Sequence, residues 1–233
     1  MTQVAHTPRT NGDEDLHDWR TVYEFWFPPR FDQNNSEALR LRLEWWMRGG
    51  ATAELPPFAS MLSAARAGQL DRWRTLPLGR LSLLMVLDQF PRGLFAGTAQ
   101  AYTSDTDALR IAEEGMRNGH YDALTSPWEK FFFFLPLAHA EGPDHVQRMK
   151  RVVSEAEAAA SQAPLYLQPI FQFSLSQAQA NLDVISRYGR FPHRNAVLGR
   201  SSTSEELTYL KEGDFVHRRQ LPGALPREVG GAV

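Results

Sequence analysis

Three polar clusters border the most apolar segments of the sequence, and their residue types are suited to acid–base chemistry. The sequence DQFPR at 88–92 follows the run LSLLMVL, and HAE at 139–141 follows FFFFLPLA. The third cluster is RYGRFPHRNAVLGR at 187–200, which holds four arginines, one histidine and no acid. A histidine beside a carboxylate can accept or donate a proton while the carboxylate orients it. The candidate catalytic residues are therefore Asp88, His139, Glu141 and His193.

Asp88 lies at the C-terminal end of the most hydrophobic helix that the sequence predicts. A carboxylate at that end opposes the helix dipole and needs a cation nearby, and Arg92 or an arginine from another segment is the obvious partner. Two interpretations remain open. Either the pair fastens two helices together, or the carboxylate faces a pocket, where burial shifts its pKa.

His139 and Glu141 are two residues apart and therefore do not share a helix face. In a loop they can converge as a base and its orienting partner, as two metal ligands, or as side chains that bond backbone amides. No complete set of three or four metal ligands occurs at a recognisable spacing in the sequence. Neither a metal nor a cofactor is therefore predicted.

The arginines of 187–200 need partners, because a desolvated charge without one costs several kcal/mol. They face solvent, pair with acids such as Asp88, Asp105 and Glu141, or surround an anionic ligand. The planar guanidinium group suits carboxylate and phosphate alike. We expect a mixture of structural pairs and free ends. The candidate ligand-binding residues are Gln89, Arg92, Asp105, Arg190, Arg194, Asn195 and Arg200.

The elements that position these clusters are predicted to be helices almost throughout. Helical periodicity and cap residues indicate long helices over 78–90, 144–162 and 165–187, and several shorter ones. Ser126 with Glu129 predicts a capping box, and so does Ser202 with Glu205 or Thr203 with Glu206. No period-2 segments with hairpin turns occur. The expected fold is all-α, with about eight helices in one domain over 15–219, between disordered tails at 1–14 and 220–233.

Composition sets the broad class of protein. The chain has 233 residues, a formal net charge of -2, 42% hydrophobic and 22% charged residues, and no cysteine. Disulfides, thiolate metal sites and cysteine nucleophiles are thereby excluded. The near-neutral charge disfavours a nucleic-acid partner, and the longest apolar runs fall short of the roughly 20 residues of a membrane-spanning helix. The N-terminal stretch has no apolar core typical of a secretory signal. The expectation is a soluble, cytoplasmic protein that does not contact a membrane.

Three stretches of the sequence resemble a known family in order and spacing. They are LGRLSLLMVLDQFPRGLFAGTAQAYTSDTDAL, FFFFLPLAHAE and RYGRFPHRNAVLGRSSTSEELTYL, and VYEFWF matches the start of the family. The family is called domain of unknown function 924, and the resemblance runs from about residue 19 to residue 215. It is similar to tetratricopeptide-like folds, so the resemblance implies a stack of antiparallel helices. It implies no particular activity.

Carried over residue by residue, the polar pattern of that family falls on the candidate residues named above. The sequence departs from the pattern at three positions. Gly93 stands where asparagine is usual, Ala140 where serine is usual, and Asn181 where histidine is usual. A histidine missing from position 181 would alter a catalytic set that included it.

Three functional hypotheses follow from these residues. The leading one is a pocket that binds a small ligand bearing a phosphate or a carboxylate group, with His139 or His193 available for proton transfer. The alternative is a helical adaptor that binds a peptide or a protein partner in a concave groove. The third, RNA binding through 187–200, needs a continuous basic face and is the weakest, given the net charge.

Overall fold

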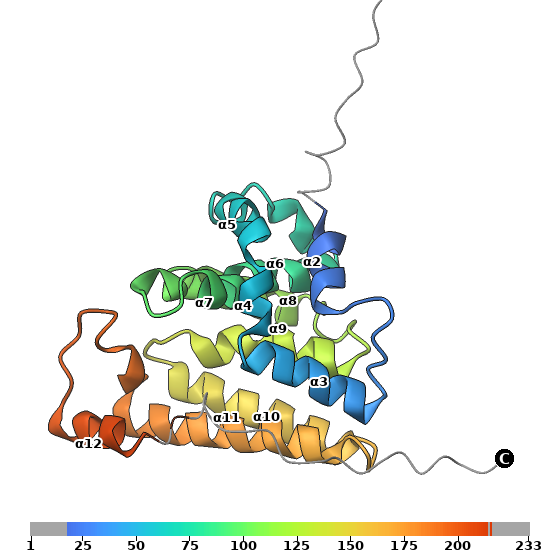
Figure 1. Ribbon diagram of the computed structural model, residues 1–233. Coiled ribbons are helices and arrows are strands. Elements are labelled where there is room, and N and C mark those ends of the chain that lie inside the picture. Colours follow the sequence, from blue (N-terminus) through green and yellow to red (C-terminus); the bar gives the residue numbers. More distant parts are fainter. Residues whose placement is uncertain (1–17, 214, 216–233) are drawn as a thin grey trace, which may run out of the picture.

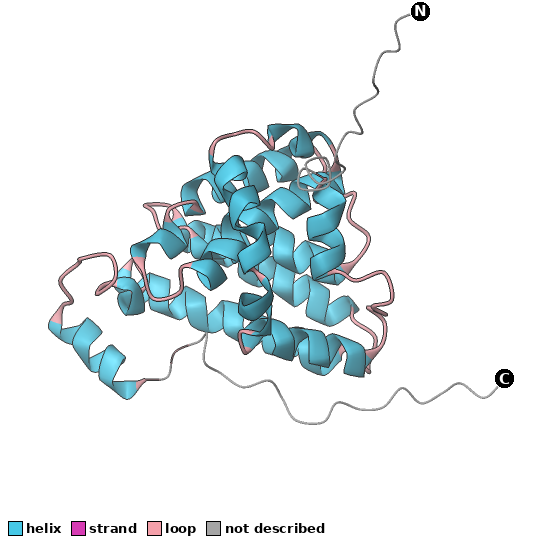
Figure 2. Ribbon diagram, turned by 45° about the horizontal axis from the view of Figure 1, so that its top comes forward, coloured by secondary structure: helices cyan, strands magenta, loops and turns pink. Residues whose placement is uncertain are grey.

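The computed structural model describes residues 18–213 and Phe215. The tails expected at 1–14 and 220–233 lie outside the described residues. Within them the chain is helical and contains no strand, so the all-α prediction is confirmed (Figure 2). The helices are α2 (Trp19–Trp26), α3 (Ser36–Met47), α4 (Gly50–Glu54), α5 (Ala59–Arg66), α6 (Pro77–Leu84), α7 (Phe90–Leu94), α8 (Asp105–Arg117), α9 (Pro127–His139), α10 (His145–Gln162), α11 (Gln168–Tyr188) and α12 (Ser204–Glu212).

The helices are arranged in layers above one long antiparallel pair. Helices α10 and α11 lie side by side at the base of Figure 1, and the short connection over 163–167 makes them antiparallel. Helix α9 packs on α10, and α8 and α6 pack on α9. The α9 layer therefore lies between the long pair and α6. The finer expectation of a tetratricopeptide-like stack stays a prediction.

The helix predicted over 78–90 changes type before it ends. It is α-helical only to Leu84, and the next five residues, Met85–Gln89, form a π-helix that leads directly into α7. Pro91 has no N–H to donate to the carbonyl four residues earlier, so the α-helical pattern cannot continue unchanged there. Single π-helical turns recur at functional sites. Asp88 and Gln89 are the last two residues of this turn.

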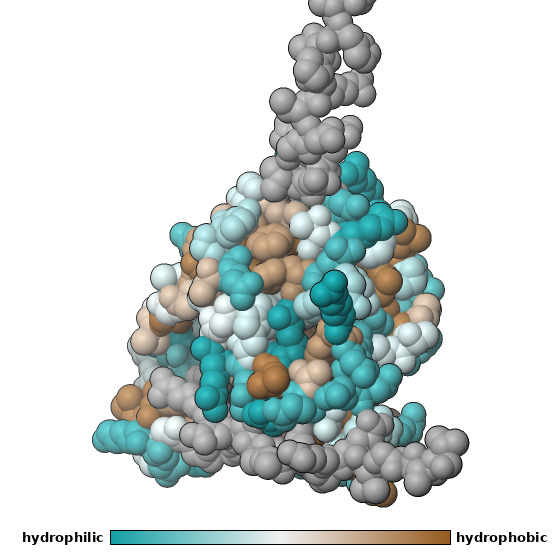
Figure 3. All heavy atoms as spheres, turned by 45° about the vertical axis from the view of Figure 1, so that its right-hand side comes forward, coloured by the Kyte–Doolittle hydropathy of each residue, from teal (hydrophilic) through white to brown (hydrophobic). Residues whose placement is uncertain are grey.

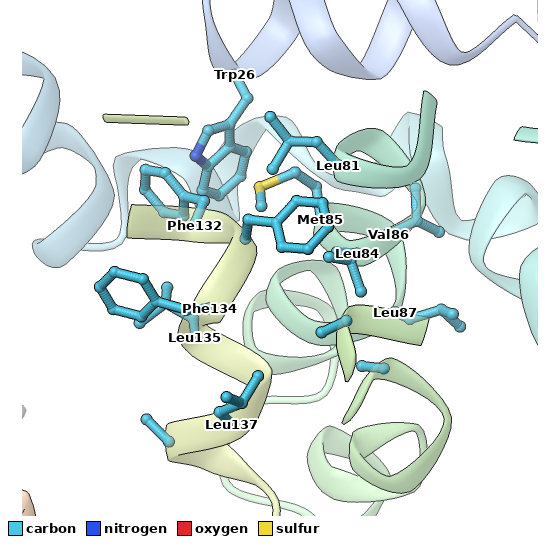
Figure 4. Close-up of a cluster of buried hydrophobic side chains, with 14 of the residues drawn as sticks. Trp26, Leu81, Leu84, Met85, Val86, Leu87, Phe132, Phe134, Leu135 and Leu137 are labelled. Carbon is cyan, nitrogen blue, oxygen red and sulfur yellow. The ribbon is translucent and has the colours of Figure 1, made fainter. Parts of the chain in front are cut away.

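The phenylalanine run 131–134 is helical and forms part of the hydrophobic core. Ser126 caps α9 by accepting a hydrogen bond from the Trp128 amide, at 3.1 Å. Side chains of α9, among them Phe132 and Leu135, meet Leu81 and Met85 from the α6 side, and Trp26 closes the cluster (Figure 4). This packing holds the π-helical turn against α9.

Of the two capping boxes that the sequence predicts, one forms. Thr203 accepts from the amide of Glu206, and the Glu206 carboxylate accepts from the Thr203 amide at 2.7 Å, at the start of α12. The capping box predicted for Ser126 forms only in part. Ser126 accepts from a backbone amide of α9, but Glu129 does not accept from the backbone amide of Ser126. Glu129 is buried and accepts instead from the hydroxyl of Tyr23, at 2.5 Å.

The surface shown in Figure 3 mixes hydrophilic and hydrophobic side chains. Within 18–213, no helix combines the length and the apolar composition that crossing a membrane requires. Helix α11 has 21 residues, but its sequence alternates apolar residues with glutamine, serine and asparagine.

Candidate functional site

Asp88 and His139 form the centre of the candidate site. Asp88 comes from the π-helical turn, and His139 is the last residue of α9. The Nδ1 atom of His139 lies 2.9 Å from both carboxylate oxygens of Asp88, whose side chain is buried. The amide of Gln89 donates to Asp88 Oδ2 at 2.6 Å. The imidazole is therefore held by a carboxylate that is itself fixed in place.

The electrostatics of this pair define its protonation state. Burial opposes the charge of Asp88, but Arg92 and His139 outweigh it and hold the pKa of Asp88 below its usual range. Burial lowers the pKa of His139 more than Asp88 raises it. At neutral pH the carboxylate is ionised and the imidazole is neutral. Since a carboxylate only accepts, Nδ1 carries the proton and Nε2 has the free lone pair.

Two arginines and a second carboxylate complete the charged part of the site. Arg92 lies 3.2 Å from Asp88 Oδ1 through Nη1 and 3.0 Å from the Asp105 carboxylate through Nη2. Arg194 reaches Asp105 at 3.3 Å and donates to the carbonyl oxygen of His139 at 2.9 Å, both through Nη1. Burial raises the pKa of Asp105, and the negative charge of Asp88 raises it further. Arg92 and Arg194 lower this pKa, but their effect is smaller. The network joins α7, α8, α9 and the 192–194 turn.

Arg194 has hydrogen-bonding capacity that the described residues do not use. Its side chain is buried between the rings of Tyr102 and Phe191, each 4.5 Å from the guanidinium carbon. Nη1 is the only nitrogen of Arg194 that donates to a described residue, and Nε is buried with no partner among them. A guanidinium group has five N–H donors. Three of the five donors of Arg194, on Nε and Nη2, therefore have no partner among the described residues.

A cavity of about 470 Å³ adjoins these side chains, and we call it the His139 cavity. Its polar part is lined by Gln89, Arg92, His139, His193 and Arg194. The indole N–H of Trp46 donates to Gln89 Oε1 at 2.8 Å, which fixes the orientation of that amide. The apolar part is lined by residues of five helices, Trp26, Leu43, Trp46, Phe131, Phe134, Leu135, Met149, Val152 and Ala178.

The remaining predicted residues of the 187–200 cluster form a second network that does not line the His139 cavity. Glu141 pairs with Arg200 and accepts from the Phe191 amide at 2.7 Å, and Arg200 Nε donates to Asn195 Oδ1 at 3.0 Å. Burial opposes the charge of Glu141, but these partners lower its pKa. Arg190 donates to both carboxylate oxygens of Glu206, at 2.7 and 2.9 Å.

This network fixes the segment 189–206 and so positions Arg194. The ring of His193 contacts those of Phe191 and Phe215 in tilted arrangements, with centroid distances of 5.4 and 6.2 Å. The catalytic roles suggested for Glu141 and His193 stay predictions. Each arginine at positions 190, 194 and 200 has a carboxylate partner, and Arg187 lies over its neighbouring tyrosine.

Several cavity residues escaped the sequence reasoning. Tyr102 and Trp46 read as ordinary core aromatics, and only the fold puts them beside polar groups. On α11, the polar residues Ser174, Gln177 and Asn181 recur at helical spacing along the cavity wall. This polar stripe is the sequence pattern from which the cavity wall could have been predicted. Asn181, where the resemblance led us to expect histidine, thus faces the same cavity as His139.

Gly93 also has a clear structural setting at the cavity edge. A Cβ atom there would lie 2.5 Å from Leu55 Cδ1 and 3.1 Å from Thr52 Oγ1. Contacts that short require the neighbour to move. Glycine at 93, where the resemblance led us to expect asparagine, therefore lets α4 pack closely on α7.

Comparison with known proteins gives a family and a structural relative. The family model described as bacterial protein of unknown function (DUF924) matches residues 22–214. No curated protein matches the chain. A solved structure, that of a protein of unknown function, ATU0120 from Agrobacterium tumefaciens, is similar to this chain, with 30% sequence identity and a TM-score of 0.59. The match covers 84% of this chain and 97% of that one.

Proposed function

Since the chain belongs to DUF924, a family of bacterial proteins of unknown function, we propose a function from the chemistry of its own cavity. The His139 cavity binds a small ligand that carries a carboxylate or a phosphate group, and His139 accepts a proton from that ligand. The observation that supports this most strongly is that a neutral histidine and two arginines line one cavity of about 470 Å³.

The arginines supply the recognition of the anionic group. Arg194 keeps most of its donors unpaired in a setting where water is largely excluded, and a planar guanidinium matches the oxygens of a carboxylate or phosphate. A buried donor without a partner is unfavourable by about 1–3 kcal/mol. A ligand oxygen that accepts from Arg194 removes that cost on binding.

The Asp88–His139 pair supplies the proton chemistry. Asp88 holds the Nδ1 proton of His139, and no described residue bonds Nε2. A proton taken up at Nε2 creates an imidazolium that the ionised Asp88 stabilises at 2.9 Å. This is the arrangement of a general base with its orienting carboxylate.

A thermal-shift screen with carboxylated and phosphorylated metabolites tests the proposal. A ligand at about 100 times its dissociation constant adds roughly 2.7 kcal/mol to the free energy of unfolding, which gives a clear shift. The variants His139→Gln and Arg194→Lys should each lose the shift. Arg187→Lys, at an exposed position outside the cavity, is the matched control and should keep it. Ligands that stabilise all of these proteins equally would contradict the proposed site, and so would the absence of any hit.

A further inference from the structure

We infer that the ligand of the His139 cavity is an elongated amphiphile, with one carboxylate at the arginines and an apolar chain that runs along α9 into a second cavity. This inference rests on the proposed function and extends it. It follows from the adjacency of two cavities, from the residues that line both of them and from the charge balance at the polar end.

The second cavity lies at the other end of α9, and we call it the Trp128 cavity. Its volume is about 690 Å³. The segment 31–34, the start of α9, the second half of α10 and the start of α11 enclose it. Its apolar wall is made by Leu39, Trp128, Phe131, Phe134, Leu167 and Phe171, while Lys130, Glu155 and Gln162 contribute polar wall.

The two cavities are adjacent along the same three helices. Phe131 and Phe134 of α9, Ala156 of α10 and Ser174 of α11 line both cavities, so a single layer of side chains separates them. Along α9 the lining residues continue from His139 back to Pro127. Twelve residue steps at 1.5 Å each make a path of about 18 Å. A ligand with its charged end at His139 can thus extend its chain toward Trp128.

The region between the two cavities has aromatic side chains on one side and short side chains on the other. The ring of Trp46 meets Phe131 at a centroid distance of 5.8 Å, and Phe131 stacks on Trp128 at 5.4 Å with an interplanar angle of 3°. The opposite wall presents Ala156 and Ser174, whose short side chains leave room. An apolar chain fits beside Phe131, Phe134 and Ala156 because it needs no hydrogen-bond partners there, while the polar side chains of Ser174, Gln177 and Asn181 line the α11 side.

The charge balance at the polar end favours a monoanion. The formal charges of Arg92 and Arg194 are already matched by Asp88 and Asp105 within 3.3 Å, and His139 is neutral. A phosphate monoester would bring a charge of about -1.5 to -2 into this site, whereas a carboxylate brings one charge for the unpaired donors of Arg194. A single carboxylate is therefore the better match.

Isothermal titration calorimetry with butanoate, octanoate and dodecanoate tests the inference. Each methylene that leaves water for the apolar path should tighten binding about 4-fold, and the gain should continue from octanoate to dodecanoate. Ala159→Phe fills the Trp128 cavity without touching the His139 cavity, because Ala159 lines only the former. It should weaken dodecanoate by roughly tenfold or more, the equivalent of about two buried methylenes, and leave octanoate unchanged.

Two further variants keep the experiment decisive. Glu157→Phe, on the exposed side of α10, adds the same side chain outside both cavities and should bind all three ligands normally. Ala158→Phe, at an exposed position of the Trp128 cavity, replaces Ala159→Phe if that protein fails to fold.

The outcomes separate this inference from the proposed function. Affinity that stops rising at octanoate, or dodecanoate binding that neither filling variant weakens, overturns the extension into the Trp128 cavity while the anion site stands. The proposed function fails if no carboxylate of any length binds, or if Arg194→Lys binds octanoate as tightly as the unmodified protein does. The extension then fails with it.

Discussion

Two clusters of this protein are built around a buried arginine and contain the same residue types. One lines the His139 cavity, and the other lines neither of the two cavities described above. The first is the site around Arg194, Asp105 and His139. The second lies between α6 and α8, where Arg80 meets Glu114 and His120. Each has a buried arginine, a carboxylate and a histidine whose pKa burial lowers. Residue type alone therefore does not distinguish a structural cluster from a ligand site.

The difference lies in how many donors of the arginine are used. Arg80 donates from Nε to His120 Nδ1 at 3.2 Å, from Nη1 to the Ile111 carbonyl at 2.9 Å, and from Nη2 to the Arg74 carbonyl at 2.9 Å and Glu114 at 3.3 Å. Arg194 donates from Nη1 alone. A buried arginine with all three nitrogens engaged is a structural element, whereas one with unused donors is prepared for a further acceptor.

Packing reinforces the contrast. A Cβ atom added to Gly115 would lie 2.5 Å from Arg80 Cδ and 2.6 Å from Phe133 Cζ, so Arg80 packs tightly against α8 at that position. Arg80 lines neither of the two cavities described above, whereas Arg194 lines the His139 cavity. Arg194 lines a cavity and uses two of its five N–H donors, whereas Arg80 lines neither cavity and uses four of five.

Removal of Arg80 should have the largest effect on stability. Arg80→Met removes the side-chain donor to the carbonyls of Ile111 and Arg74, and it leaves the half-buried Glu114 with Arg74 as its remaining cation. We therefore expect a loss of about 3–5 kcal/mol in the free energy of unfolding. Urea unfolding measures it. Arg110→Met, at an exposed ion pair, should change stability by less than about 0.5 kcal/mol. A loss below about 1 kcal/mol at Arg80 would show that saturated hydrogen bonding does not mark a structural arginine.

Removal of Arg194 should cost less stability and more binding. After Arg194→Met, Asp105 keeps Arg92 as its partner at 3.0 Å, and methionine still fills the space between the rings of Tyr102 and Phe191. We expect a loss of about 1–3 kcal/mol by urea unfolding, together with loss of carboxylate binding by calorimetry. If Arg194→Met destabilised the protein as strongly as Arg80→Met, Arg194 would be structural and the contrast between the clusters would disappear.

The sequence predicts part of this contrast. The borders of apolar runs pointed to Asp88, Arg92 and His139, and the arginine cluster pointed to Arg194, because a polar group next to buried helices must find a partner. The structure brings these four side chains together in one network. The sequence also named acids that do form ion pairs, since Asp88 pairs with Arg92, Asp105 with Arg194 and Glu141 with Arg200. It could not foresee the partner of Arg190. Arg190 pairs with Glu206 only because α12 folds back toward the end of α11, and no local pattern encodes that return. Arg80 reads as one polar residue in an apolar helix, and its saturation depends on carbonyls of α8 and the 71–75 turn.

The helical content was predictable because caps and periodicity are local, whereas the π-helical turn was not. The mostly apolar sequence over 78–90 fits an α-helix equally well, and only the packing of Asp88 and Gln89 against α9 reveals the wider turn. The two cavities could not be predicted for the same reason. They depend on how three helices approach one another, and residues such as Ala156 and Ser174 acquire meaning only from that approach.

The smallest expected effect is a shift in the pKa of His139 on ligand binding, and it distinguishes His139 directly from His120. The pKa values of His139 and His120 both lie below the ordinary value, so as the pH falls through about 6.5 the unfolded chain binds protons before the folded chain does. Both histidines therefore lower stability on the acid side and contribute fully above that pH.

Octanoate at the arginines places a negative charge near Nε2 of His139 and should raise its pKa, while the pKa of His120 should not move. NMR titration of the imidazole Cε1–H signals measures both values, with octanol as the uncharged control. Equal shifts at the two histidines, or none at His139, would place the bound carboxylate away from the Asp88–His139 pair.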